Sequence, residues 1–150
     1  MKRRFRFITL LLVAIFVIGA ACKSKSGQTD TTATSGMPAG IVVKTVKVNN
    51  LTATLLSSNG KLKVGDQEVT LAFNDAVGKS VDVGAVSLNF HMPPMGGMGA
   101  MNDVVTFTTT DTLGVYRGKV HVSMAGEWQA QLAYEGSAGT GKTTFSVTAQ

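Results

Sequence analysis

Residues 86–92, VSLNFHM, alternate apolar and polar side chains from end to end. Successive side chains of an extended strand point to opposite faces, so the apolar members share one face and the polar members the other. The same period of two recurs in residues 69–73, 116–124, 128–134 and 145–149. These alternating segments predict half-buried β-strands. No segment of useful length after residue 40 shows a helical period.

Turn signals separate these runs at short intervals, among them Asn59-Gly60, Asn74-Asp75 and Leu113-Gly114. About seven short strands at such spacing predict an all-β fold, an immunoglobulin-like antiparallel β-sandwich over residues 41–150. A small Greek-key barrel is the alternative. Residues 114–135 are expected to form one hairpin, with Ala125-Gly126 at its tip.

The N-terminal region predicts export and membrane anchoring. Residues 1–21 combine a basic start, an apolar stretch over residues 7–18 and the small residues 19–21, the pattern of a signal peptide. Cys22 is the only cysteine, and its setting resembles a lipobox, so we expect it to be lipidated. Residues 22–40, rich in Ser, Thr and Gly, are expected to form a flexible tether. A cleaved protein with a free thiol and an uncleaved anchor are the alternatives.

The net charge of +5 reflects mainly the signal peptide. Four of the fourteen basic residues lie in residues 1–6, which leaves ten basic against nine acidic residues from Cys22 onward. A protein with a net charge near +1 lacks the clustered basic surface typical of nucleic-acid binding. We therefore expect no nucleic-acid partner.

The stretch HMPPMGGMGAM, residues 91–101, follows the alternating segment directly. Its methionines stand at positions 92, 95, 98 and 101, separated largely by glycine and proline, which exclude a helix. Thioether sulfur is a soft, neutral ligand that favours Cu(I). Methionine more often fills gaps in a core, and Met92, which continues an apolar face, fits packing and ligation equally well. Met95, Met98 and Met101 are expected in the free loop.

Two histidines and one further methionine extend the candidate site. His91 adjoins the loop, and His121 and Met124 would approach it if the loop lies at the same end of the sandwich. Imidazole suits copper, although each histidine taken alone is more often an ordinary surface residue. Zinc would favour cysteine and histidine, and calcium would favour carboxylates. The predicted metal ligands for Cu(I) are His91, Met92, Met95, Met98, Met101, His121 and Met124.

Residues 136–143, GSAGTGKT, match the phosphate-loop pattern GxxxxGK[ST] in full. That motif needs a following helix whose N-terminus faces the phosphates. Here a β-branched segment follows instead, so we predict a glycine-rich hairpin turn and no nucleotide site. The sequence also lacks GxSxG, HExxH and paired catalytic carboxylates, and Asp103 is expected to be solvated or capping. We predict that the protein is not an enzyme.

Several segments together resemble the YtkA-like (FixH-related) domain. They are FHMPPM (residues 90–95), GVY (114–116) and MAGEW (124–128), with LKVGD (62–66) leading into residues 69–71. The resemblance covers most of residues 41–150. It implies an immunoglobulin-like sandwich in the cell envelope, often linked to copper handling, heavy-metal efflux or cytochrome oxidase assembly. The family's methionine element would correspond to Met92, Met95 and Met124.

We therefore expect a bacterial envelope lipoprotein, facing the periplasm or the exterior, that binds Cu(I) through its methionine-rich loop for capture, delivery or efflux. Its expected partners are the membrane, through the lipid anchor, and a copper-handling or oxidase-assembly protein. The alternative is a protein-interaction module that uses the loop as a pliable apolar surface and binds no metal. A structural lipoprotein with buried methionines is a third reading.

Overall fold

The computed structural model describes residues 38–150 of the chain. The predicted signal peptide, the lipidation site at Cys22 and most of the predicted tether lie outside the described residues. Eight strands make up the described part: β1 (Ile41–Val48), β2 (Leu51–Ser57), β3 (Gly65–Asn74), β4 (Ala85–Met92), β5 (Met101–Thr109), β6 (Val115–Val122), β7 (Gly126–Gly136) and β8 (Gly139–Ala149).

Hydrogen bonding runs through all eight strands in the order β1-β2-β3-β6-β5-β4-β7-β8, and every neighbouring pair is antiparallel. The predicted all-β antiparallel class is confirmed, with eight strands in place of about seven. The sheet is nearly closed and barrel-like. Strands β4, β5 and β6 are consecutive neighbours and bring β6 beside β3, which is a Greek-key arrangement.

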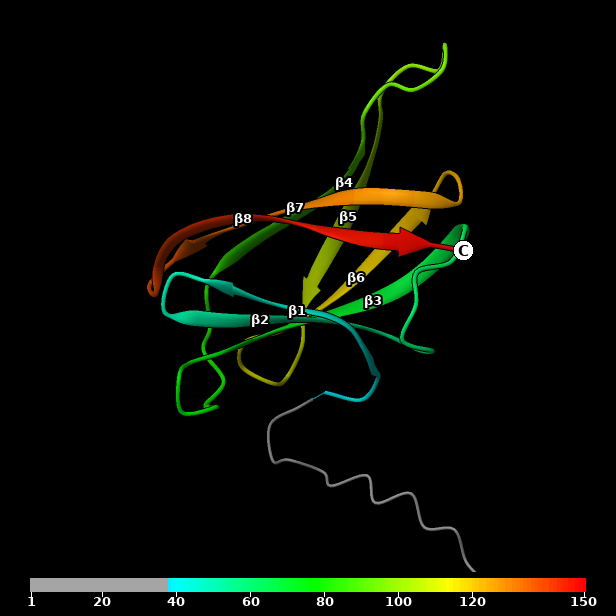
Figure 1. Ribbon diagram of the computed structural model, residues 1–150. Coiled ribbons are helices and arrows are strands. Elements are labelled where there is room, and N and C mark those ends of the chain that lie inside the picture. Colours follow the sequence, from blue (N-terminus) through cyan, green and yellow to red (C-terminus); the bar gives the residue numbers. More distant parts are fainter. Residues whose placement is uncertain (1–37) are drawn as a thin grey trace, which may run out of the picture. The chain divides into compact units, whose positions relative to one another are not determined.

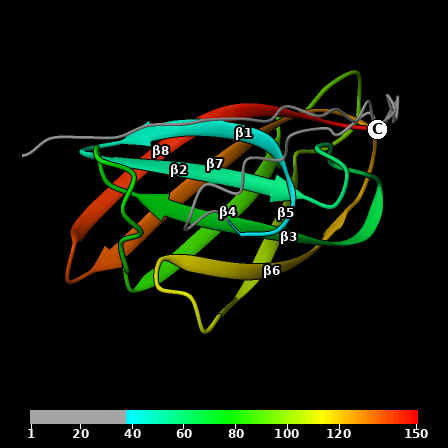
Figure 2. The ribbon, with the colours of Figure 1, turned by 90° about the horizontal axis from the view of Figure 1, so that it is seen from below.

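β5 is the strand that joins the two halves of the sheet. Its first residues, Met101–Val105, pair with β4, and its last residues, Thr106–Thr109, pair with β6. Figure 2 shows the result: β1, β2, β3 and β6 form one layer, and β4, β7 and β8 cross it obliquely. β1 and β8 lie next to each other at the opposite edge without a shared ladder.

The expected hairpin over residues 114–135 is wrong. β6 pairs with β3 and β5, and β7 pairs with β4 and β8, so residues 123–125 carry the chain from one layer to the other. Both strands are alternating and adjacent in sequence, which predicts a hairpin. Which strands pair depends on which of them bury the same core, and adjacency in the sequence does not determine it.

The core fills the space between the layers. Trp128, Phe73 and Phe90 are among its fully buried side chains, and Phe73 packs edge-to-face against Tyr116 and Tyr134 with ring centroids 5.9 and 5.5 Å apart. The aromatic residues bury the largest apolar areas and therefore dominate the packing energy. The predicted alternation is confirmed in β6, where every second side chain from Tyr116 to Val122 points inward.

The glycine-rich segment that matches the phosphate-loop pattern is a hairpin turn, as predicted. β7 ends at Gly136 and β8 begins at Gly139, and these two glycines pair across the turn. The following residues continue as β8 and not as a helix. Backbone N–H groups of this segment are therefore used in the β7–β8 ladder.

Candidate functional site

The methionine-rich stretch is the end of a long hairpin between β4 and β5. Met92 pairs with Met101, and Met95 pairs with Met98 three residues further along, so one register runs to the tip. Figure 1 shows this end of the hairpin, the yellow-green loop at the top of the view, projecting from the barrel as an arm. We call residues 93–100 the arm; its side chains are all exposed.

A two-glycine turn closes the tip of the arm. Gly96 and Gly97 have φ values of 53° and 90°, which are those of a type I′ turn, the tightest common hairpin connection. The N–H of Met95 donates to the carbonyl of Met98 at 3.2 Å, and the N–H of Met98 donates back at 2.8 Å. Side chains of such a pair stand side by side on one face of the hairpin. The turn therefore holds two thioethers together.

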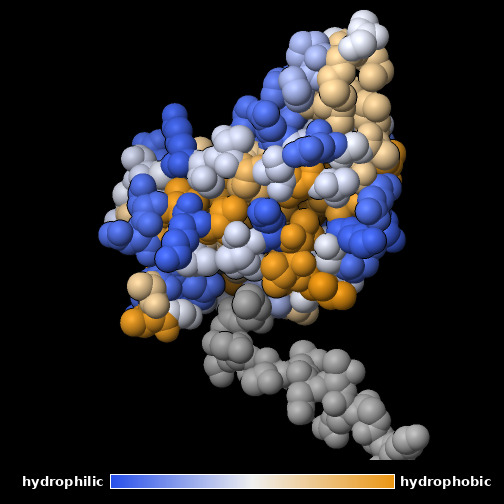
Figure 3. Space-filling model, viewed as in Figure 1, coloured by the Kyte–Doolittle hydropathy of each residue, from blue (hydrophilic) through white to orange (hydrophobic). Residues whose placement is uncertain are grey.

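The two tip methionines are open to solvent. Met95 and Met98 are 51% and 50% exposed. In Figure 3 the outer end of the arm ranges from pale blue to pale orange, without the deep blue that covers much of the body. The tip pair, Met95 and Met98, is thus an uncharged and accessible set of two soft donors.

The other three candidate methionines lie at the base of the arm. Met92 is 1% exposed and belongs to the core, and Met101 and Met124 are half-buried and pack against that core. The methyl end of Met92 lies against Gly126, where a Cβ would come within 3.1 Å of it. Met101 was expected in the free loop, but it opens β5 opposite Met92. This base cluster is primarily packing.

His91 lies on the outer, polar face of β4, as the alternation predicts. Its Nδ1 is 2.9 Å from Oδ1 of Asn102, and the same oxygen accepts a hydrogen bond from Nδ2 of Asn89 at 3.1 Å. Since that oxygen can only accept, Nδ1 of His91 is the donor. In the neutral ring, Nε2 then keeps its lone pair for a proton or a metal ion.

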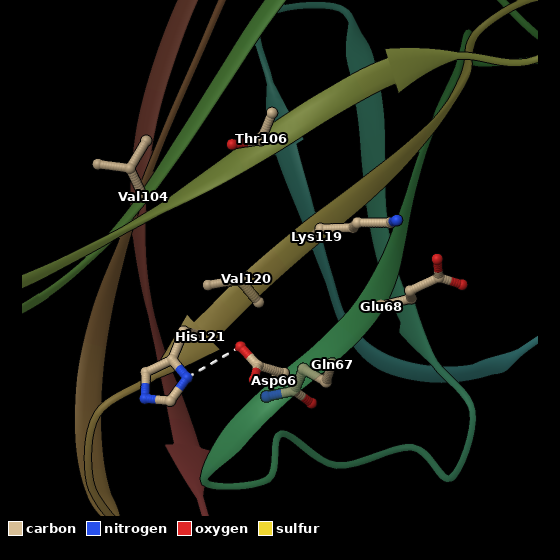
Figure 4. A pocket seen from close by; sticks show the side chains of 8 residues that line it. All are labelled: Asp66, Gln67, Glu68, Val104, Thr106, Lys119, Val120 and His121. Carbon is tan, nitrogen blue, oxygen red and sulfur yellow. Dashed lines mark hydrogen bonds and ion pairs between the residues drawn. The ribbon is translucent and has the colours of Figure 1, made fainter.

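His121 lies in a different place, on the outer face of β6. Its Nδ1 is 2.9 Å from Oδ1 of Asp66 on β3, in an exposed pair. Figure 4 shows both residues at one end of a groove of about 670 Å³ between β3, β5 and β6, with Glu68 and Lys119 further along it. His121 is engaged with Asp66 in this groove and not with the tip pair.

Asp103 fastens the base of the arm to the end of β6. Its two carboxylate oxygens accept hydrogen bonds from the N–H and the hydroxyl of Ser123, at 2.8 and 2.7 Å. Of the two roles expected for Asp103, solvated or capping, these contacts correspond to capping. The contact ties β5 to the β6–β7 connection at the point where β5 leaves β6 for β4.

A second structural contact joins Tyr116 of β6 to Asp82, which lies in the connection between β3 and β4. We call this contact the clamp. The Tyr116 hydroxyl donates to Oδ1 of Asp82 at 2.8 Å and accepts the N–H of Val83 at 3.1 Å. Burial and the Asp82 bond raise the pKa of Tyr116 above its ordinary value of 10.0. The N–H of Gly84 and the Tyr116 hydroxyl lower the pKa of Asp82 below its ordinary 3.8.

The fold thus divides the seven predicted ligands into a tip pair, a base cluster and two separate histidines. Within residues 38–150, no group of three or more His, Cys, Asp or Glu side chains is placed to hold a metal ion. The donors that are both adjacent and accessible are the two thioethers of the tip pair. The pairing of Met95 with Met98 was not predicted from the sequence, although Gly-Gly between two extended segments is a signal for a two-residue hairpin turn.

A family model described as YtkA-like matches residues 45–133, more than half of the chain. The match extends from β1 into β7 and includes the whole arm. No curated protein and no solved structure matches the sequence. In the described residues, 38–150, no helix has the length and apolar character needed to cross a membrane.

Proposed function

The chain belongs to the YtkA-like family, and we propose that it captures Cu(I) at the tip pair, as an envelope lipoprotein anchored through Cys22. The observation that carries the proposal is the pairing of Met95 with Met98 across a two-glycine turn, at half exposure. Burial would normally be the favourable state for such side chains, each worth about 1.5–3 kcal/mol when fully buried. Leaving both in solvent suits a ligand-binding role.

The chemistry of the donors favours a soft monovalent ion. Thioethers are neutral, so they bind Cu(I) without releasing a proton, and they discriminate against hard ions such as calcium and magnesium. A site with two neutral donors at an exposed tip exchanges its ion readily. Its role is therefore capture and hand-over to a copper-handling or oxidase-assembly partner for delivery or efflux, with no catalytic step.

The fit of the remaining predicted ligands to this site is limited. His91 presents a free Nε2, but it lies four residues from Met95, about 13 Å along an extended strand. His121 is paired with Asp66 in the groove. Met92, Met101 and Met124 support the base of the arm. The proposal therefore assigns binding to Met95 and Met98 and gives the other five residues no required part.

The test is a titration of the purified chain with Cu(I) against a chromophoric competitor under reducing conditions. The Met95→Leu/Met98→Leu variant should lose competition, because leucine keeps the size and apolar character but lacks sulfur. The matched control is Met92→Leu, which removes a buried thioether and should bind as the wild type does. Equal binding by the wild type and the double variant would overturn the proposal.

Trp128 gives the same titration a second readout. It is the only tryptophan in the chain, and its indole N–H donates to the carbonyl of Met124 at 3.1 Å, beside the base cluster. Binding at the tip should leave its fluorescence unchanged. Quenching that Met92→Leu abolishes would instead place the ion among Met92, Met101 and Met124.

A protein-interaction role without metal is the second candidate, favoured by the exposed apolar side chains of the arm and by Val104, which is 66% exposed at its base. In that case an envelope partner should co-purify with the chain in the presence of a Cu(I) chelator. Loss of the partner on chelation would favour copper capture.

A further inference from the structure

The tip pair supplies fewer donors than a soft metal ion can take. Cu(I) and Ag(I) accept from two to four soft ligands, and two neutral thioethers on one side of the ion leave further positions for soft donors. Met95 and Met98 provide two thioethers, and no third candidate ligand in residues 38–150 lies at the tip. An ion held there has open positions that face solvent.

The arm's geometry keeps the other candidate ligands in residues 38–150 away from the tip pair. By alternation, Met92 and Met101 lie on the face of the hairpin opposite to Met95 and Met98. His91 lies on the same face as the tip pair, but about 13 Å away along the strand, and its ring is held by Asn102. The two-glycine turn is too tight to fold back onto the base.

The tip is suited to meet a second identical tip. Residues 91–102 contain no Asp, Glu, Lys or Arg, so two arms approach without like-charge repulsion. The glycines and prolines that flank the methionines have small side chains or none, so they do not project beyond the methionine side chains. The arm projects from the barrel, so the two bodies do not collide (Figure 1). A two-fold dimer, in which identical surfaces meet, is the commonest form of homo-oligomer.

We propose that the tip pair is half of a metal site and that a second copy of this chain supplies the other half. One Cu(I) or Ag(I) ion is held by four thioethers, Met95 and Met98 from each copy. This inference rests on the proposed capture of Cu(I) and adds to it the ligand count, the stoichiometry and the partner. During hand-over, a soft donor of an acceptor protein replaces one arm at the same open positions.

Sedimentation velocity of the full chain during titration with Ag(I) tests the proposal. Dimer should form as silver is added up to one ion for two chains. Excess silver should then return the protein to monomer, because each tip pair acquires an ion of its own. This rise and fall distinguishes a shared ion from dimerisation caused by binding elsewhere.

Variants separate the failure of this inference from that of the proposed function. Met95→Leu/Met98→Leu should remain monomeric at every ratio, and Met92→Leu should dimerise as the wild type does. Silver binding at one ion per chain with no dimer at any ratio of silver to protein would overturn the shared site and leave copper capture standing. Absence of any silver or copper binding would overturn both. Dimer that persists in the double variant would also refute a thioether bridge.

Discussion

At the scale of single residues, two methionines of the same hairpin have opposite environments. Met92 is 1% exposed, whereas Met95 is 51% exposed. The difference follows from position along one strand register: residue 92 faces the core, and residue 95 lies beyond the last core neighbour. Residue type alone therefore does not identify a ligand. The neighbours across the ladder decide it.

The Tyr116 hydroxyl offers a stability test with an internal control. Tyr116→Phe leaves the buried N–H of Val83 without its acceptor, which should lower the free energy of unfolding by about 1–3 kcal/mol. Tyr134→Phe should cost less, because the Tyr134 hydroxyl has only a 3.4 Å contact with Asn49 and both rings pack on Phe73. Urea denaturation measures both. Equal losses would refute the clamp.

We predict that the Asp82 carboxylate makes an acid-sensitive contribution to the stability of the folded protein. Because its pKa is lowered in the folded protein, the carboxylate's stabilising effect is complete above the ordinary 3.8 and is lost as the pH falls through the lower folded value. Asp82→Asn keeps an oxygen acceptor and removes the titration. The variant should lose less stability than the wild type between pH 6 and pH 3, as measured by denaturant midpoints.

The control for that measurement is Asp111→Asn, at an exposed carboxylate in the connection between β5 and β6. It should follow the wild-type pH dependence. If Asp82→Asn also follows the wild-type dependence of stability on pH, the Asp82 carboxylate has no special part in acid stability.

At the scale of elements, the turn Gly96-Gly97 determines whether the tip pair exists. Both residues have positive φ, and a Cβ added to either would meet nothing within 4 Å, so only backbone conformation restricts substitution. A left-handed conformation costs a non-glycine residue roughly 1–2 kcal/mol, and asparagine tolerates it best. The pairing of Met95 with Met98 therefore depends on backbone conformation and not on packing.

Two substitutions at Gly96 test this point. Gly96→Val disfavours the positive φ strongly and should weaken Cu(I) binding about tenfold, a factor equivalent to about 1.4 kcal/mol. Gly96→Asn keeps the type I′ turn, for which Asn-Gly is the preferred sequence, and should bind as the wild type does. Thermal unfolding should be unchanged in both, because the tip lies outside the core. Equal affinities would mean that the turn does not organise the ligands.

At the scale of the whole molecule, the barrel and the arm are separable. The core closes below Met92 and Met101, and β5 joins the two layers through its own ladder residues. The hydrogen bonds between Asp103 and Ser123 hold the arm's base in place. Nothing described in the arm beyond residue 92 or before residue 101 contributes to the core.

Replacement of residues 94–99 by Asn-Gly tests that separation. The new turn follows the existing register, in which Pro93 faces Ala100 next to the pair Met92 and Met101. The shortened protein should keep its melting temperature within a few degrees, since the removed residues are exposed, and should lose Cu(I) binding. A large fall in melting temperature would show that the arm is structural.

Period-two alternation is a local property of the chain, so the amino-acid sequence is enough to predict the all-β class and most of the inward faces. It places Met92 on an apolar face but leaves packing and ligation open for that residue. It did not specify β1, β2 or β5 individually. β2 is buried on both faces over residues 53–57, and the Thr-rich β5 changes partners midway, so neither alternates cleanly. The Asn49-Asn50 turn between β1 and β2 was a usable signal that was missed.

Which strands pair and which candidate ligands meet depends on long-range contacts in the folded protein. The sequence predicted His91, His121 and five methionines as ligands, since spacing along the chain carries no information on distance across layers. The ladder placed His121 beside Asp66 and Met101 against Met92, and left Met95 and Met98 together. Long-range pairing is set by the shared core, and it is this that reduced the candidate site to the tip pair.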